Sequence, residues 1–280
     1  MRKNHYNLVK AGWNDEGIGW YGIPEKKIEP LFPDAKVGDY VTFGTYEQDN
    51  DLTNGAEPIE WQYIADKDGH KLLLAEYALD CRAYHDIDES ITWENCTLRK
   101  WLNNDFYNTA FSAEDKEKIV TAYNENPDST ELYKSYGLWA SIPGWSGGQG
   151  GKATADNVFL LSWTEARDYF DGKLDDDSIW GEWTEHSDYE NDGDFNQKLL
   201  CTPTAYAKAK GVVIREWGDD SVRGCCCWWL RSPGVRENNK HATQVEFDGE
   251  LDSWPAIGHG REDGAPAVYD KGIRPAILID

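Results

Sequence analysis

Lysine and arginine are scarce in this sequence. It has 28 basic residues against 51 aspartates and glutamates, which gives a formal net charge of −23 at pH 7 and a pI near 4.5. Nucleic-acid binding needs clustered basic side chains, and anionic membranes attract the same clusters. The composition therefore disfavours both nucleic acid and membrane surfaces as partners.

Long apolar runs are missing as well. No stretch is long enough to cross a bilayer, and the first residues, MRKNHYNLVKAGWNDEG, lack the apolar region of a secretory signal. We therefore expect no signal peptide and no membrane insertion. The expected location is the cytoplasm, or a particle that carries the protein without export.

Cysteines are few, and their spacing does not fit a metal site. Six are present, at positions 81, 96, 201 and 225–227, and none forms a C-x-x-C pair. Neighbouring cysteines on a strand point to opposite faces, and a chain without a secretory context does not favour disulfides. We expect small buried hydrophobic residues rather than disulfides or structural zinc.

Aromatic residues, in contrast, are abundant, with 14 tryptophans and 15 tyrosines in 280 residues. Such a chain can bury a sizeable core, and its length fits one mixed domain. The aromatic side chains suit either an irregular core or a recognition surface.

Local signals predict short strands first. Residues 37–45 alternate as a strand, and residues 59–65 and 71–77 flank Asp68-Gly69, which favours a tight hairpin turn. Residues 157–161 have the composition of another strand. The domain is therefore expected to open with a small antiparallel sheet.

Short helices are predicted between these strands. Leu98, Trp101, Leu102 and Phe106 share one helical face. Capping boxes at 112–115 and 162–165 predict helices over 116–120 and up to residue 170, and Thr202-Pro203 predicts a helix over 204–210 that Gly211 ends. Residues 124–137 look like a polar linker and 146–151 like a flexible glycine loop. Short helices among short strands indicate an α+β fold.

The last fifth of the chain organises the rest. Cys225–Leu230 and Ala276–Ile279 read as buried strands, whereas residues 235–271 are rich in glycine, proline and polar groups, which favours loops. Arg231 and Arg274 each lie beside a proline next to these strands. We expect both guanidinium groups to be buried and bonded to carbonyls or carboxylates, a structural role.

These residues carry a resemblance. Trp228 to Gly234 (WWLRSPG), then Asp248-Gly249, then Gly272 to Ala276 (GIRPA) resemble a family of uncharacterised proteins from gut Firmicutes and their phages. The resemblance runs from about Val37 to the end, which leaves 1–36 as an N-terminal extension packed on a domain of residues 37–280. It implies a C-type-lectin-like fold, related to the variable proteins of diversity-generating retroelements and to formylglycine-generating enzymes. It also implies a scaffold that presents one ligand-facing surface, on a cytoplasmic or phage-particle protein.

We therefore predict a non-enzymatic ligand-binding protein, whose ligand is a protein or a glycan and whose recognition segment is residues 235–271. Tryptophan, tyrosine and arginine are the usual hot-spot residues of such surfaces. The predicted ligand-binding residues are Arg236, Glu237, Asn238, Asn239, Asp252, Ser253, Trp254, His259, Arg261, Glu262, Asp263 and Tyr269. In the retroelement-linked proteins this region is the one that varies. Alternatively, Trp254 and Tyr269 cap the core and the charges only keep the loop soluble.

Two other classes of function stay open. One is an enzyme on the same scaffold. A glycoside hydrolase would draw a carboxylate pair from Asp252, Glu262 and Asp263 with His259 as proton carrier. A formylglycine-generating-type oxidase would need a cysteine pair near the C-terminus, but no cysteine follows Cys227. The other class is a structural subunit, for example of a phage particle.

Other motifs are weaker. Gly144-Trp145-Ser146-Gly147-Gly148 fits the G-x-S-x-G pattern of a hydrolase, but more glycine follows instead of a helix. Gly150 to Thr154 lacks parts of a phosphate loop. The acidic insert 171–197 contains Asp188, Glu190 and Asp192, weak calcium candidates, because Leu199 stands where the bidentate glutamate belongs. No cofactor is expected.

Overall fold

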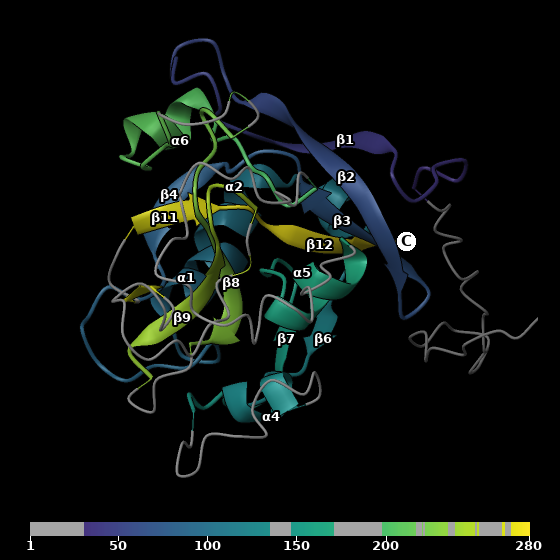
Figure 1. Ribbon diagram of the computed structural model, residues 1–280. Helices are drawn as coiled ribbons and strands as arrows, with labels where there is room; N and C mark the ends of the chain where they lie inside the picture. Colours follow the sequence, from purple (N-terminus) through teal and green to yellow (C-terminus); the bar gives the residue numbers. More distant parts are fainter. Residues whose placement is uncertain are drawn as a thin grey trace, which may run out of the picture.

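Two five-stranded sheets carry the fold in this computed structural model (Figure 1). The structure describes residues 31–134, 147–170, 198–216, 220, 222–234, 239–249, 251, 265–266 and 270–280. Its strands are β1 (Tyr40–Tyr46), β2 (Glu57–Lys67), β3 (His70–Ala75), β4 (Asp80–Ala83), β5 (Ile119–Val120), β6 (Ala122–Asn124), β7 (Thr154–Asp156), β8 (Trp228–Pro233), β9 (His241–Val245), β10 (Ala265–Pro266), β11 (Asp270–Ile273) and β12 (Ala276–Ile279). Short helices lie among them, which confirms the mixed α+β class.

The first sheet has the order β1-β2-β3-β12-β5 and is antiparallel throughout. The predicted hairpin between β2 and β3 is confirmed. Its central residues, Asp68 and Gly69, both have positive φ (54° and 85°), as a turn that matches the twist of the strands requires. The last strand of the chain, β12, inserts between β3 and β5 and so fixes the C-terminus in the middle of this sheet.

The second sheet has the order β10-β9-β8-β11-β4. Its β8 and β11 run parallel, while the other pairs are antiparallel. Only Arg274 and Pro275 separate β11 from β12, so the chain passes directly from the second sheet into the first. A third, small sheet consists of β6 and β7, which pair antiparallel.

The helices are short. They are α1 (Thr97–Trp101), the π-helical turn η1 (Leu102–Phe106), α2 (Tyr107–Ala110), α3 (Ala113–Lys116), α4 (Ser129–Lys134), α5 (Trp163–Tyr169) and α6 (Ala205–Ala209). The predicted apolar face is confirmed for Leu98, Leu102 and Phe106, which are buried. Both capping boxes form, on Ser112 and Ser162. Every helix in the described part of the chain is too short or too polar to cross a bilayer.

One hydrophobic cluster joins both sheets and the helices, from Phe43 to Ile279. Aromatic rings fill part of it: Phe106 packs 5.0 Å from Tyr46 and 6.1 Å from Phe111, between ring centroids. Leu31 packs against the cluster, and its N–H donates to the carbonyl of Asp280 at 2.6 Å. Residues 1–30, most of the expected extension, lie outside the described residues.

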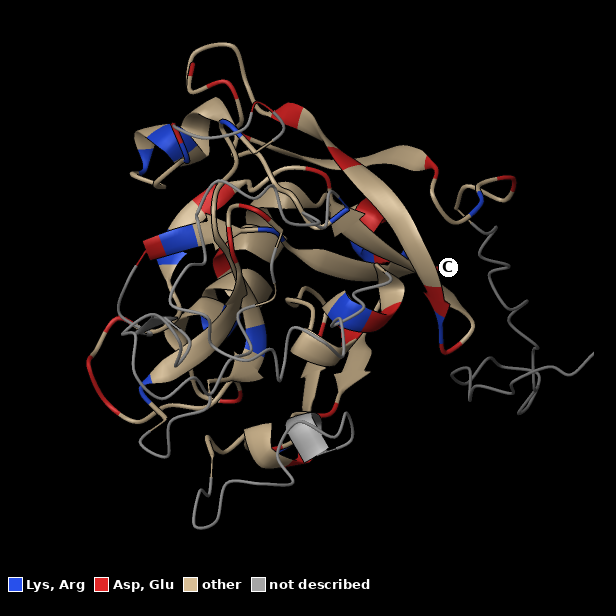
Figure 2. Cartoon of the chain, in the orientation of Figure 1, with Lys and Arg blue, Asp and Glu red and all other residues tan. Residues whose placement is uncertain are grey.

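Charged residues occur on several elements around this core. Figure 2 shows acidic residues on β2 and on several loops, and basic residues on α6 and β11. The excess of acid is therefore spread over several elements and does not form one acidic face in the described part of the chain.

Several expected boundaries were wrong. The expected linker 124–137 contains the end of β6 and α4, and Asn124 and Asn126 are buried. The helix expected over 116–120 ends early, and its last two residues form β5. In each case a pairing partner distant in sequence, β7 or β12, decides the local structure.

Strand positions shifted too. The strand expected over 225–230 begins at Trp228 and runs to Pro233, and the one expected over 157–161 was wrong: only an isolated bridge from Phe159 to Ala276 forms there, after β7 at 154–156. The helix expected over 204–210 is α6 at 205–209, and its N-cap is Thr204, whose hydroxyl accepts from the Ala207 N–H. The glycine loop is packed where it is described: Gly147, Gly148 and Gly150 are buried.

Candidate functional site

The predicted recognition segment, residues 235–271, leaves and re-enters the same sheet. Strand β8 ends just before it, β11 begins at its last two residues, and the two strands pair at Trp228 and Gly272. The Gly272 N–H donates to the Cys227 carbonyl at 3.0 Å, and a side chain at Gly272 would lie 3.0 Å from both Ala78 Cβ and Cys226 Sγ. Glycine thus allows β8 and β11 to lie side by side; because they run parallel and pair at the start of β8, the segment crosses from the far end of β8 back to the start of β11.

Part of the segment belongs to the core. Strand β9 (His241–Val245) pairs with β8, and four of its five residues are buried. The Thr243 hydroxyl donates to the Ser232 carbonyl at 3.0 Å. The expectation of an exposed loop over all of 235–271 was therefore wrong for this stretch. The polar residues of this stretch do not prevent a strand, because the Thr243 hydroxyl donates to a β8 carbonyl and the Gln244 amide nitrogen donates to Glu246.

Asn239 is the one predicted ligand-binding residue that the structure describes, and it is 4% exposed. Its amide oxygen accepts from the Gln149 N–H at 2.7 Å, and its amide nitrogen donates to the Gln149 carbonyl at 2.7 Å. Its backbone has φ of +51°, which asparagine tolerates better than most residues, and its carbonyl accepts from the Ile91 N–H. In this structure Asn239 ties the loops around Gln149 and Ile91 together, which is a structural role.

The other predicted ligand-binding residues lie outside the described residues. The carboxylates of the alternative hydrolase site are among them, and the candidate calcium ligands also lie outside. These are Arg236, Glu237, Asn238, Asp252, Ser253, Trp254, His259, Arg261, Glu262, Asp263 and Tyr269, together with the calcium candidates Asp188, Glu190 and Asp192. Their roles stay predictions.

Arg231 has the buried structural role expected of it. Its guanidinium donates to the Leu160 carbonyl at 2.8 Å and to the carboxylate of Glu165. Lys67 reaches the other oxygen of that carboxylate at 2.6 Å. Burial alone would raise the pKa of Glu165, but Arg231 and Lys67 outweigh it and lower the pKa to about 2. A doubly paired carboxylate thus anchors the end of β8 to α5.

Arg274 plays the same part after β11. It is 2% exposed, and its Nε donates to the Ala75 carbonyl at 2.8 Å. Its Nη2 lies 3.8 Å from Glu76 Oε2, and its guanidinium carbon lies 5.2 Å from the centre of the Trp228 ring. Both ends of the predicted recognition segment are therefore held by buried arginines.

The cysteines are reduced and surround the same region. All six are free thiols, and all but Cys227 are buried, as expected. The Cys226 N–H donates to the Cys201 carbonyl at 2.9 Å. Burial raises the pKa of the Cys227 thiol, and the nearby Glu246 raises it further. Thiols held in this protonated state pack as small apolar groups.

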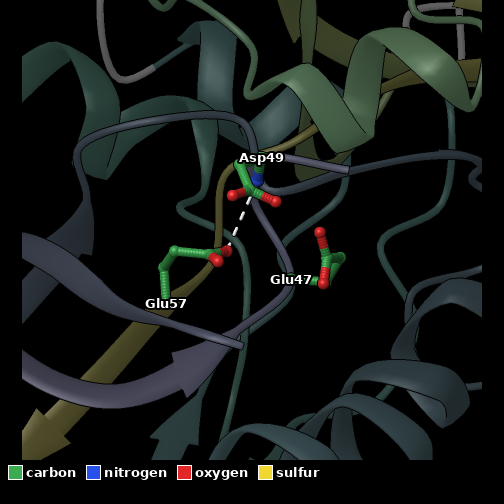
Figure 3. A group of neighbouring side chains, drawn as sticks. All are labelled: Glu47, Asp49 and Glu57. Atoms are coloured by element: carbon green, nitrogen blue, oxygen red, sulfur yellow. Dashed lines mark hydrogen bonds between the residues drawn. The ribbon is translucent and has the colours of Figure 1, made fainter. Parts of the chain in front are cut away.

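An acidic group that the sequence reasoning missed lies on the loop between β1 and β2. Glu47, Asp49 and Glu57 each place one carboxylate oxygen within 4.8 Å of the others (Figure 3). Two of these carboxylates already accept bonds from the loop itself: Glu57 from the Gln48 N–H at 2.7 Å, and Asp49 from the Asn54 amide at 2.7 Å. Oxygen ligands of this type suit calcium. In this structure the carboxylates accept hydrogen bonds that hold the β1–β2 loop together.

A cleft near Arg274 was also missed. Its volume is about 390 Å³, and Tyr40, Glu76 and Arg274 are among the residues that line it. No local motif marks it, because its walls come from β1, β2, the end of β3, the end of α5 and residues near 198–200.

Comparison with known proteins gives one match. A family model described as "Domain of unknown function (DUF6273)" matches residues 68–280. No curated protein and no solved structure matches the chain. The match begins inside the β2–β3 hairpin, although β1 and β2 belong to the same sheet as β3. Because the match covers well over half of the sequence, the chain belongs to the DUF6273 family.

Proposed function

We propose that this chain is a non-enzymatic ligand-binding protein that presents residues 235–271 as its recognition segment on a C-type-lectin-like scaffold. The ligand is a protein or a glycan. The observation that carries the proposal is the pairing in one sheet of β8 and β11, the two strands that flank the segment. Binding residues on irregular segments work best when a rigid scaffold positions them.

The anchoring of these ends supports the same reading. The partners of Arg231 are Leu160 and Glu165, and those of Arg274 are Ala75, Leu200 and Glu76. All of these partners lie outside residues 235–271. The anchoring of the two arginines therefore does not depend on the sequence of the recognition segment, whereas β9 and Asn239 within the segment are themselves bonded to the scaffold. The mixed fold with short helices agrees with the C-type-lectin-like resemblance.

Binding can be tested with a printed glycan array and the purified full chain. We expect specific retention on a subset of glycans, lost in Trp254→Ala and in Tyr269→Ala and kept in Tyr123→Ala. Tyr123 is a matched control, because it is 68% exposed and lies on β6, outside the segment. Retention that survives both segment substitutions would place recognition elsewhere on the molecule.

Diversification of the segment needs a separate test. Deep sequencing of the gene across a population of its source organism compares codons 235–271 with those for 225–234 and 272–280. Substitutions crowded into the segment would support a diversified binding surface and exclude a fixed catalytic site there. A segment as invariant as its flanks would remove the retroelement part of the proposal and favour one dedicated ligand or the carboxylate alternative.

A further inference from the structure

The cleft beside Arg274 holds a pair of opposite charges. Arg274 is 2% exposed and the Glu76 side chain 29%, and their closest N–O distance is 3.8 Å. Burial raises the pKa of Glu76, although the charge of Arg274 and a hydrogen bond from Tyr40 oppose the shift. Removing the charge of Arg274 from water is costly, so its pairing with Glu76 is a specific structure rather than a chance surface contact.

Aromatic side chains line the same cleft. Tyr40 is 51% exposed, and Tyr63, Tyr169 and Phe170 also contribute to the walls. Burial, followed by the charge of Glu165, raises the pKa of Tyr169 to about 12. Burial and Glu76 also raise the pKa of Tyr40. Both hydroxyls therefore keep their protons at neutral pH and remain hydrogen-bond donors as well as acceptors.

The lining carries charges of both signs. A ligand carboxylate would meet Glu76 as well as Arg274 and Lys198, and a ligand ammonium would meet Arg274 and Lys198 as well as Glu76. A neutral ligand meets neither repulsion. The volume, about 390 Å³, lies near the lower end of the usual range for small-molecule sites.

We propose that this cleft binds a neutral saccharide. One face of the sugar ring packs on the exposed ring of Tyr40, and the sugar hydroxyls donate to the carboxylate of Glu76. Arg274 holds that carboxylate in place from below, and the amide of Gln62, another lining residue, offers both a donor and an acceptor. Aromatic stacking together with a fixed carboxylate suits polyhydroxylated rings, which have an apolar face and polar edges.

This site does not depend on the recognition segment. Its lining residues come from 37–40, 62–64, 76, 169–170, 198–200 and 274, all outside 235–271. Either site can therefore be lost without the other.

The test is saturation-transfer NMR on the full chain. The neutral probes are glucose, galactose, mannose and N-acetylglucosamine at millimolar concentration, and the charged probes are acetate and tetramethylammonium. We expect a signal from at least one neutral sugar and none from the charged probes. Tyr40→Ala and Glu76→Gln should each weaken sugar binding by about tenfold, as loss of a central contact does. Tyr123→Ala should leave binding unchanged.

The outcomes separate cleanly. The saccharide site is refuted if no neutral sugar of the panel gives a signal, if a charged probe binds in preference, or if Tyr40→Ala and Glu76→Gln bind as the parent does. Sugar binding that is lost in Trp254→Ala but kept in Tyr40→Ala would assign it to the recognition segment and refute the cleft alone. Circular dichroism confirms folding of each variant. Tyr40 is half exposed at the start of β1, so the alanine variant should fold.

Discussion

The salt-bridge network of Glu165 gives the sharpest prediction about stability. Substitution of Glu165→Gln removes the charge that Arg231 and Lys67 share but keeps the size of the side chain and an oxygen for the Ser162 N–H. It leaves Arg231, which is 4% exposed, without an anion. Breaking one partner of a buried ion pair costs about 3–5 kcal/mol.

The pKa of Glu165 leads to a similar value. Its pKa is about 2, compared with 4.5 for an ordinary glutamate. Since each pKa unit corresponds to about 1.4 kcal/mol, the ionised carboxylate contributes about 3 kcal/mol to the free energy of unfolding at neutral pH. The folded-state pKa is depressed, so this stability is complete above the unfolded pKa near 4.5 and is lost as pH falls toward 2.

The assay is urea unfolding followed by tryptophan fluorescence, at neutral pH and at pH near 3. The matched control is Asp115→Asn in the capping box of α3, a half-buried carboxylate that pairs with no buried cation. We expect Glu165→Gln to lose about 3 kcal/mol at neutral pH and the control about 1 kcal/mol or less. The gap between parent and Glu165→Gln should shrink by about half or more near pH 3. Equal losses for the two variants, or a gap that does not depend on pH, would refute the network as the source of stability.

Three further predictions follow from single positions. Gly150→Ala should lower the free energy of unfolding by at least about 2 kcal/mol in urea titrations, because its Cβ would lie 1.9 Å from the Asn126 carbonyl oxygen; a loss below about 1 kcal/mol would contradict this packing. Asp68→Val should cost about 1–2 kcal/mol in the same assay, since a β-branched residue disfavours φ of +54°, and unchanged stability would argue against the turn. Thiol titration should find six reactive cysteines after denaturation and at most Cys227 reacting readily in the native protein; fewer than six would indicate a disulfide.

Features set by neighbouring residues could be predicted from the sequence. The hairpin at Asp68-Gly69 and the capping boxes at Ser112 and Ser162 each depend on contacts within a few residues, and all three form. The buried roles of Arg231 and Arg274 also followed from their apolar surroundings. Such local signals predict the α+β class but not the order of the strands in the sheets.

Features set by distant partners could not be predicted. Asn126 has the composition of a linker residue, yet it is buried because its amide donates to the Lys152 carbonyl at 2.8 Å. Asp156 is buried because Arg99 and Trp93, more than fifty residues earlier, bond its carboxylate. The spacing of apolar residues does not reveal such distant partners, so buried polar segments are predicted to be loops.

The candidate sites follow the same division. The boundaries of the recognition segment were predicted from two apolar runs in the sequence. Strand β9 and Asn239 within the segment were wrongly predicted to be exposed, because their polar groups bond to the core. No local sequence pattern predicts the cleft at Arg274, because Tyr40, Glu76 and Lys198 are far apart in the sequence and come together only in the folded chain.

Arg274 stands at the boundary between the two proposed sites, and its contacts decide how far they can be separated. Its bond to the Ala75 carbonyl fixes the end of β11 to β3 whatever occupies the cleft, while its contact with Glu76 orients a carboxylate toward the proposed sugar. Removing the arginine would disturb both sites and the core at once, so it cannot assign either function. Tyr40 is half exposed, so Tyr40→Ala distinguishes ligand binding from the stability of the scaffold, whereas the binding of Glu76→Gln is compared together with its free energy of unfolding, because that change also leaves Arg274 without its carboxylate.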